Sequence, residues 1–246
     1  MINNQLIFGI RPVIEAVKAG KEIDKLLIQN GLQGELIQEL KRLIEKNKIL
    51  FQYVPVEKLN RLTKKNHQGV ICFVSMVSFG AIENVLPTVY EQGKIPLILI
   101  LDRITDVRNF GAISRTAECA GVDAIIIPAK ETAQINADAM KTSAGALNRI
   151  PVCRSKNLKN TIEFLKNSGM QIIACTEKAQ IAYYEIDYAL PTAIIVGSEE
   201  NGIDKEYLSI SKVVKIPMLG EIESLNVSVA AGIVVFEAIR QRSNDE

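Results

Sequence analysis

Polar side chains gather in three short stretches of the sequence, and each stretch follows an apolar run. Asn109 and Arg115 belong to the first stretch, Glu199 to the second, and Ser224 and Asn226 to the third. We expect Arg115 to lie near the first turn of a helix that Asn109 caps, which gathers hydrogen-bond donors where a phosphate can bind. The first stretch therefore suits the binding of a phosphate, although an exposed helix arginine and a capping asparagine are ordinary features by themselves.

The third stretch leads into an almost wholly apolar helix. A strand at 213–216 passes through a loop with proline and glycine to Asn226, a natural N-cap for a helix over 227–236. Arg240 and Arg242 suit the negative end of the helix dipole. We expect this helix to be buried because both of its faces are apolar. One interpretation of this segment is a capped core helix that follows a simple connecting loop. The loop, however, holds more polar residues than a connection needs, which argues for a function.

In this order, the three stretches resemble the three signature motifs of the SpoU branch of the SPOUT RNA methyltransferases. They read D-V-R-N-F-G-A-I-S-R-T-A (106–117), I-I-V-G-S-E-E-N-G (194–202) and, within 213–242, I-P-M-L-G-E-I-E-S-L-N-V-S. Residues 7–10 (I-F-G-I) and 67–70 (H-Q-G-V) also resemble the substrate-binding domain of ribosomal RNA guanosine 2'-O-methyltransferases of this family. The resemblance therefore covers the whole chain.

This resemblance implies S-adenosylmethionine as the cofactor, bound without a metal against a C-terminal trefoil knot. The residues that it assigns to the cofactor are Val196, Gly197, Ser198, Ile216, Met218 and Leu225, and those that it assigns to catalysis are Asn109, Arg115, Glu199, Ser224 and Asn226. Gly197 would let the backbone approach the cofactor closely. Arginine stays protonated in proteins, so we assign Arg115 to phosphate clamping and electrostatic activation before proton removal. Val107 replaces the proline expected in the first motif, which removes no functional group.

The leading function that the resemblance implies is 2'-O-methylation of a guanosine in large-subunit (23S) ribosomal RNA. Alternatives in the same branch are a transfer-RNA guanosine 2'-O-methyltransferase and a resistance methyltransferase acting on ribosomal RNA. A catalytically silent RNA-binding or ribosome assembly protein is an alternative of a different class, which the intact catalytic set disfavours. Because family members dimerise through the knotted region, we expect a homodimer whose active site is completed at the subunit interface.

Composition predicts a folded globular protein. The chain has 246 residues, of which 48% are hydrophobic, enough to form sizeable cores. Residues 1–5 lack the pattern of a signal peptide, and no apolar run approaches the roughly 20 residues of a membrane span, so we expect a cytoplasmic protein without a membrane partner. Four separate cysteines and a single histidine make a metal cluster improbable, and we interpret the cysteines as reduced, mostly core thiols.

Charge is distributed unevenly along the chain. Residues 1–76 carry 12 Lys and Arg against 7 Asp and Glu, a net charge of +5, whereas residues 77–246 carry −4. A basic segment recruits a phosphate backbone, mostly without sequence preference, although surface charge often fluctuates this much. The donor-rich loop at 60–69 is the candidate RNA-contacting loop, and a solvated loop is the alternative. Our candidate RNA-binding residues are Arg61, Lys64, Lys65, His67 and Arg108.

The sequence predicts an α/β protein with two parts. In the first part, the predicted helices are 11–19, 35–46 and 56–62, and the predicted strands are 25–29, 50–54 and 70–77. In the second part, a helix at 81–91 precedes strands at 96–101, 124–127, 151–154, 171–174, 193–196 and 213–216, with helices at 111–120, 137–144 and 158–167 between them. This alternation predicts a parallel sheet.

We expect a small N-terminal α/β RNA-binding domain at 1–77, a linker and helix at 78–92, and a parallel-sheet methyltransferase domain with a C-terminal trefoil knot, the SPOUT fold, at 93–246. The first strand of the second part is followed by D-R-I-T-D-V-R-N rather than by a glycine-rich turn, which argues against a conventional dinucleotide site. A phosphate-binding P-loop sequence is also missing.

Overall fold

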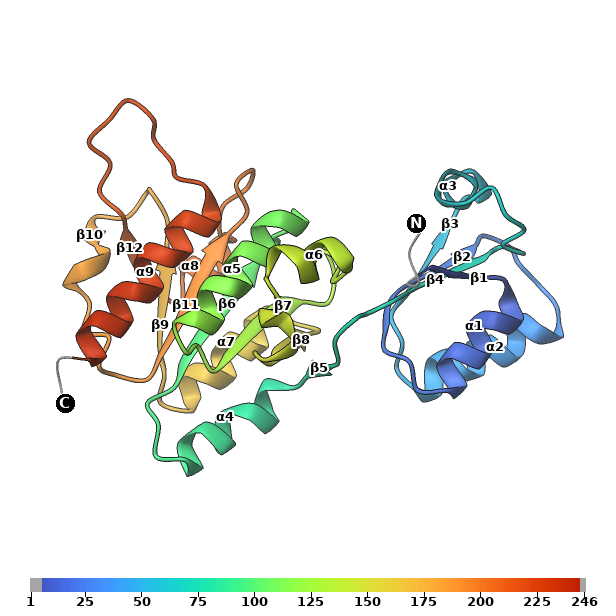
Figure 1. Ribbon diagram of the computed structural model, residues 1–246, viewed down its shortest axis with the longest axis horizontal. Coiled ribbons are helices and arrows are strands. Elements are labelled where there is room, and N and C mark those ends of the chain that lie inside the picture. Colours follow the sequence, from blue (N-terminus) through green and yellow to red (C-terminus); the bar gives the residue numbers. More distant parts are fainter. Residues whose placement is uncertain (1–5, 244–246) are drawn as a thin grey trace. The chain divides into compact units, whose positions relative to one another are not determined.

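The computed structural model describes residues 6–243, so residues 1–5, on which the signal-peptide expectation rests, lie outside the described part. The chain divides into two compact units, which are drawn in Figure 1. The small unit runs to Ser78 and includes Gln134–Ala137, and the large unit comprises Phe79–Ala133 and continues from Asp138. Over residues 6–243, no helix is long and apolar enough to cross a membrane.

The small unit is a four-stranded mixed sheet with helices on both faces. Its strands, in sheet order, are β1 (Leu6–Phe8), β4 (Val70–Val74), β2 (Ile23–Gln29) and β3 (Phe51–Val54), and its helices are α1 (Ile10–Lys18), α2 (Glu35–Lys46) and α3 (Val56–Leu62). Only the pair of β2 and β3 is parallel. Leu26 and Leu40 belong to the core of α1 and α2, while Leu27 and Leu59 belong to a core on the other face. Strand β4 ends at Val74, three residues before the predicted end.

The large unit is built on an eight-stranded sheet. Its strands, in sheet order, are β10 (Ile181–Ala182), β12 (Lys212–Lys215), β9 (Gln171–Cys175), β11 (Thr192–Gly197), β6 (Leu97–Asp102), β7 (Ala124–Pro128), β8 (Val152–Ser155) and β5 (Phe79–Gly80). All seven pairings are parallel, as the alternation of strands and helices predicts. The apolar runs form these strands because both faces of the sheet are covered.

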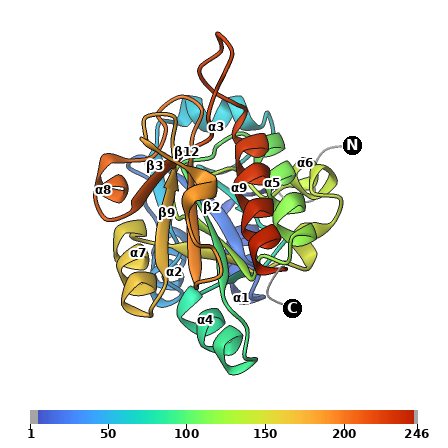
Figure 2. The same cartoon turned by 90° about the vertical axis from the view of Figure 1, so that its left-hand side faces the viewer.

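Helices cover both faces of the large sheet. They are α4 (Ile82–Glu91), α5 (Val107–Cys119), α6 (Ala137–Thr142), α7 (Leu158–Asn167), α8 (Lys205–Leu208) and α9 (Val227–Arg242), with short 3-10 turns at Ala146–Asn148 and Tyr183–Glu185. Figure 2 shows α5 and α9 on one side of the sheet and α7 and α8 on the other. Ile98 and Ile100 of β6 pack in one core with Ile162 and Leu165 of α7.

The start of α5 and the burial of α9 differ from the predictions. Helix α5 begins at Val107 rather than at residue 111, because the carboxylate of Asp106 accepts hydrogen bonds from two backbone amides of the first turn. Helix α9 continues past its apolar part to Arg242, so that Arg240 and Arg242 lie in its last turn, as predicted. It is also only half buried: the side chains of Val229 and Phe236 are 50% and 49% exposed. The predicted burial of both faces of α9 is therefore wrong for the single chain.

The C-terminal end of α9 is tied to the edge of the sheet where the strands begin. The guanidinium of Arg242 donates hydrogen bonds of 2.7 to 3.0 Å to the backbone carbonyls of Tyr188, Ile95, Pro96 and Leu190. Burial lowers the pKa of this arginine from its ordinary value. The contacts fix one end of α9, and the cap at Asn226 fixes the other.

Candidate active site

Two asparagine side chains and one glutamate side chain, one from each motif, meet at the C-terminal end of the sheet strands. The Nδ2 atom of Asn226 donates to Oε1 of Glu199 at 2.6 Å and to Oδ1 of Asn109 at 3.0 Å. Asn109 in turn donates from Nδ2 to the same Oε1 at 3.2 Å. This Asn109–Glu199–Asn226 triangle joins the start of α5, the loop after β11 and the start of α9.

Strand pairing brings the triangle together. Strands β6 and β11 run side by side in register, so that Gly197 is level with Asp102 and the loops that follow leave the sheet at the same point. Asn226 is the N-cap of α9, as predicted, because its Oδ1 accepts from the backbone N–H of Ser228 at 2.9 Å. Asn109 is not the cap of α5, since Asp106 has that place. The amide of Asn109 is thereby left for Glu199.

Gly197 is required by the fold of its own loop. A Cβ atom at this position would lie 2.3 Å from the backbone carbon of Gly202 and 2.4 Å from the amide nitrogen of Ile203. A backbone bridge from Ser198 to Gly202 closes the loop, and its turn places Glu199 toward Asn226. We expected Gly197 to let the backbone approach the cofactor closely. In the structure, the backbone of Gly202 and Ile203 makes that close approach.

A cavity of about 350 Å³ adjoins the triangle, and we call it the cofactor cavity. This size falls within the range of small-molecule sites. Its lining includes all six residues that the resemblance assigns to a cofactor: Val196, Gly197, Ser198, Ile216, Met218 and Leu225. Ser224 and Glu199 also line it. Apolar side chains for an aromatic base and backbone groups at strand ends are both present, so the residues fit the expected cofactor.

A second cavity of about 500 Å³ also has Glu199 in its lining. Its lining residues are Arg103, Ile104, Thr105, Asp106, Asn109, Glu131, Ser198, Glu199, Glu200, Asn201 and Val227. The segment Ser198–Asn201 and Val227 also line the cofactor cavity. Glu199 therefore stands in the wall shared by two cavities, with its partner Asn109 facing the second one.

Two predicted catalytic residues stay outside the triangle. Arg115 is exposed on α5, more than two turns beyond Val107, so the expectation that it lies near the first turn is wrong. Arg108 lies seven residues earlier and is therefore on the same face of α5. The two arginines form an exposed basic ridge on this helix. Ser224 lines the cofactor cavity from the loop between β12 and α9.

Sequence reasoning missed an ion pair that anchors the site. Asp102, which is 1% exposed at the end of β6, accepts two hydrogen bonds of 2.9 Å from the guanidinium of Arg103. The same carboxylate accepts from the backbone N–H of Asp204 at 2.8 Å. Arg103 has a φ of +56°, a region that costs free energy for residues other than glycine. A D-R pair at a strand end is the signal that could have indicated this contact.

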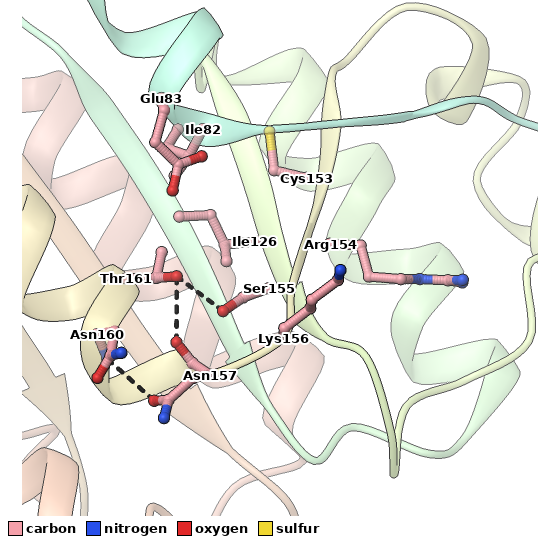
Figure 3. A pocket seen from close by; sticks show the side chains of 10 residues that line it. All are labelled: Ile82, Glu83, Ile126, Cys153, Arg154, Ser155, Lys156, Asn157, Asn160 and Thr161. Carbon is pink, nitrogen blue, oxygen red and sulfur yellow. Dashed lines mark hydrogen bonds between the residues drawn. The ribbon is translucent and has the colours of Figure 1, made fainter. Parts of the chain in front are cut away.

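A third cavity, of about 340 Å³, is shown in Figure 3. The hydroxyls of Ser155 and Thr161 lie 2.7 Å apart in its wall. Cys153 also lines it, and burial raises the pKa of that thiol to about 11. This cavity shares no lining residue with the other two and contains no residue of the three motifs. None of the predicted catalytic or cofactor-binding residues therefore lines this cavity.

In the small unit, the predicted RNA-binding loop is held by its histidine. Nδ1 of His67 accepts from the backbone N–H of Gly69 at 3.0 Å, which leaves the proton on Nε2 to donate to Asn60 at 2.9 Å. Both ring nitrogens are thus engaged, so His67 shapes the loop and does not offer its ring N–H to RNA. Lys64 and Lys65 are exposed on this loop, and Arg61 is exposed in the last turn of α3, just before it. The ammonium of Lys65 lies 5.6 Å from the ring centre of Phe8.

The cysteines do not form a metal or nucleophile site. Within residues 6–243, no three His, Cys, Asp or Glu side chains are grouped so that they could hold a metal ion. Burial raises the pKa of Cys72 and of Cys175 to about 12, so both thiols are protonated and unreactive at neutral pH. Cys119 is exposed on α5, so it departs from the core position expected of most of the thiols.

Comparison with known families gives two matches along the chain. Residues 96–236 match the family described as SpoU rRNA methylase, and residues 6–80 match the family described as RNA 2'-O ribose methyltransferase substrate binding. The chain therefore belongs to the SpoU rRNA methylase family, and it is an RNA methyltransferase.

Individual relatives are similar over most of the chain. A Staphylococcus saprophyticus protein assigned to the TrmH family of tRNA/rRNA methyltransferases is 36% identical and aligns over 97% of this chain and 96% of its own. An AdoMet-bound rRNA methyltransferase from Sinorhizobium meliloti is 25% identical, with a TM-score of 0.62 over 96% of this chain and 87% of its own. A TrmH/SpoU tRNA modifying enzyme from A. aeolicus is 33% identical, with a TM-score of 0.57 over 67% of this chain and 85% of its own.

Proposed function

We propose that this protein transfers a methyl group from S-adenosylmethionine to a ribose 2'-hydroxyl of RNA, on a guanosine of large-subunit ribosomal RNA. The observation that carries the proposal is the position of Glu199, which Asn109 and Asn226 hold in the wall shared by the cofactor cavity and the second cavity. A group in that wall touches both a bound cofactor and a ribose that enters from the other side.

The charge of the cofactor cavity suits a cationic ligand. Its lining holds the carboxylates of Glu177, Glu199, Glu200 and Glu223 and the ammonium of Lys178. A negative surrounding stabilises a sulfonium, and Ile216, Met218 and Leu225 provide apolar walls for an adenine. When bound, S-adenosylmethionine supplies a methyl group activated by its sulfonium charge.

Glu199 is the group best placed to handle the ribose hydroxyl. Its Oε1 receives the hydrogen bonds from Asn109 and Asn226, which hold the carboxylate in one orientation. Its other oxygen accepts the hydrogen bond of the 2'-hydroxyl and takes its proton as the bond from O2' to the methyl carbon forms. The electron pair of the broken carbon–sulfur bond stays on sulfur. Arg108 and Arg115 bind the phosphates that flank the ribose.

Support for ribosomal RNA comes from the small unit. That unit matches a substrate-binding family and carries the excess of positive charge. It exposes Arg61 at the end of α3 and Lys64 and Lys65 on the loop that follows. The names of the relatives leave both ribosomal RNA and transfer RNA open as substrates, so a tRNA guanosine 2'-O-methyltransferase is the second candidate. Either substrate is found in the cytoplasm, where we place the protein.

We also propose that the protein forms a homodimer. The loop between β12 and α9 projects from the large unit in Figure 2, and Leu219 and Ile222 on it are 101% and 79% exposed. Val229 and Phe236 on α9 are also apolar and half exposed, and we call these four residues the apolar surface. A second copy that covers this surface brings its own motif residues to the site. The trefoil knot stays a prediction of the resemblance.

The deciding experiment maps ribose methylations in cellular RNA after deletion of the gene. We expect one 2'-O-methyl mark to disappear from a guanosine of the large-subunit RNA and to return when the purified protein is added with S-adenosylmethionine. Loss of a transfer-RNA mark instead would favour the second candidate. An unchanged methylation map, together with no methyl transfer to either RNA in vitro, would contradict the proposed function.

A further inference from the structure

The second cavity lies where an open parallel sheet is expected to bind its ligand. Helix α5 follows β6 onto one face of the sheet, while α8 follows β11 onto the opposite face. The segments that follow β6 and β11 therefore leave toward opposite faces of the sheet. Such a divergence creates a crevice outside the carboxyl ends of the two strands. Arg103–Asp106 enters the cavity from β6, and Ser198–Asn201 enters it from β11.

The proposed reaction fixes which part of the substrate can reach this cavity. Glu199 and Asn109 both line it, and Glu199 also lines the cofactor cavity. A 2'-hydroxyl in contact with Glu199 must lie on a ribose at the mouth of the second cavity. The base is attached to the neighbouring ribose carbon, so the space of about 500 Å³ beyond the wall is within its reach.

Charge decides between the base and a phosphate. The cavity is lined by the carboxylates of Asp106, Glu131, Glu199 and Glu200, with the guanidinium of Arg103. Asp106 is engaged as the cap of α5, and Arg103 is engaged by Asp102. Glu131 and Glu200 are exposed. Carboxylates repel a phosphate but accept hydrogen bonds from the N–H groups of a base.

We infer that the second cavity holds the base of the acceptor nucleotide, and that Glu131 and Glu200 accept hydrogen bonds from its N–H groups. This inference rests on the proposed function, because that function places the ribose at Glu199. Single-stranded RNA bases are read on their Watson–Crick edges by such contacts. Guanine presents a ring N–H beside an amino group on that edge, a pair of donors that matches the two oxygens of a carboxylate. Adenine and cytosine each present a single amino group, and uracil presents a single ring N–H.

Nucleoside binding tests this inference without any methyl transfer. The full-length protein is saturated with S-adenosylhomocysteine, and the affinities of guanosine, adenosine, cytidine and uridine are measured by saturation-transfer NMR. The variants Glu131→Gln and Glu200→Gln keep the size of each side chain but replace one acceptor oxygen by a donor. Glu163→Gln, on the exposed surface of α7, is the matched control. Thermal unfolding midpoints verify that all three variants are folded.

We expect guanosine to bind most tightly, and each cavity variant to weaken guanosine binding by about tenfold while the control changes nothing. Equal binding of the four nucleosides, no detectable binding, or guanosine binding that survives both substitutions would overturn the inference. The proposed function is judged separately, by transfer of labelled methyl to RNA. Selective nucleoside binding without methyl transfer would contradict that function and leave the base cavity standing. Methyl transfer without nucleoside selectivity would do the reverse.

Discussion

The side-chain amide of Asn226 donates a hydrogen bond of 2.6 Å to Oε1 of Glu199, although 27 residues separate the two in the sequence. The same asparagine caps α9 through its Oδ1, so one side chain both begins the helix and holds the carboxylate. Donor and acceptor atoms of Asn226 therefore have different tasks, and a substitution can separate them.

Asn226→Asp is expected to keep α9 and to abolish activity. Aspartate caps helices as well as asparagine does, so the unfolding midpoint should stay close to that of the wild type. The new carboxylate cannot donate to Glu199 and repels it, and we expect methyl transfer to fall about 100-fold or more. The control, Asn226→Ala, removes the cap as well and should cost about 1 kcal/mol of stability. Full activity in the aspartate variant would show that the triangle has no part in the reaction.

Gly197→Ala should distort the loop that carries Glu199. Its Cβ would lie 2.3 Å from the backbone of Gly202, so the backbone must shift at a cost of about 1–3 kcal/mol. We expect weaker S-adenosylmethionine binding in calorimetry and a lower unfolding midpoint. Gly220→Ala is the matched control, because no atom lies within 4 Å of a Cβ built there. Equal behaviour of the two alanine variants would contradict the tight-loop explanation.

Arg115→Ala should remove methyl transfer while cofactor affinity changes little, because the side chain is exposed on α5 and does not line the cofactor cavity. Arg115→Lys keeps the charge but loses the two-pronged grip on a phosphate, so we expect low residual activity. Arg149→Ala, another exposed arginine with a 78% exposed side chain, is the control. Calorimetry with S-adenosylmethionine and a labelled-methyl assay on RNA separate the two effects, and a large loss of cofactor binding would place Arg115 elsewhere in the mechanism.

Phe236→Asp should yield a monomer. The ring is 49% exposed on the apolar side of α9, and a charge there opposes burial by a second copy. Light scattering at micromolar concentration should give twice the chain mass for the wild type and the single mass for the variant. Leu62→Asp, at another exposed apolar position in the small unit, should leave the mass unchanged. A monomeric wild type would refute the proposed dimer.

Neutralising the loop cations of the small unit should weaken RNA binding in a salt-dependent way. Replacing Arg61, Lys64 and Lys65 by glutamine removes up to three phosphate contacts, and the slope of log affinity against log salt should become shallower by about 2. Lys18→Gln is the control, since Lys18 is paired with Glu39 at 2.7 Å. Affinity measured across a salt series checks the prediction, and an unchanged slope would mean that this loop does not contact the backbone.

Much of the fold follows from local sequence. The spacing of apolar residues defines α2 at Glu35–Lys46 and α7 at Leu158–Asn167, because a helix needs one apolar stripe facing the core. The continuous apolar runs of β6 and β11 predict a parallel sheet covered on both faces. The order of the three motifs, read as a resemblance, selected every residue of the Asn109–Glu199–Asn226 triangle.

Competition between neighbouring groups limited the local predictions. Asp106 and Asn109 are both good caps, and only the folded chain shows that Asp106 takes the amides of α5. From the sequence alone, the two ring nitrogens of His67 could form hydrogen bonds with RNA. In the structure, both form hydrogen bonds within the protein, to Gly69 and Asn60. Such choices depend on distances across the fold that sequence spacing does not fix.

Tertiary structure alone decided how the site is divided. Parallel pairing sets the ends of β6 and β11 level, and this register places Glu199 in the wall between two cavities. The hydrogen bond from the backbone N–H of Asp204 to Asp102 also arises only when distant segments pack, and so does the exposure of Phe236. Residue types determined by themselves which chemistry is available to this protein, whereas strand register and helix packing determined where that chemistry occurs, because hydrogen bonds and cavities depend on positions in space.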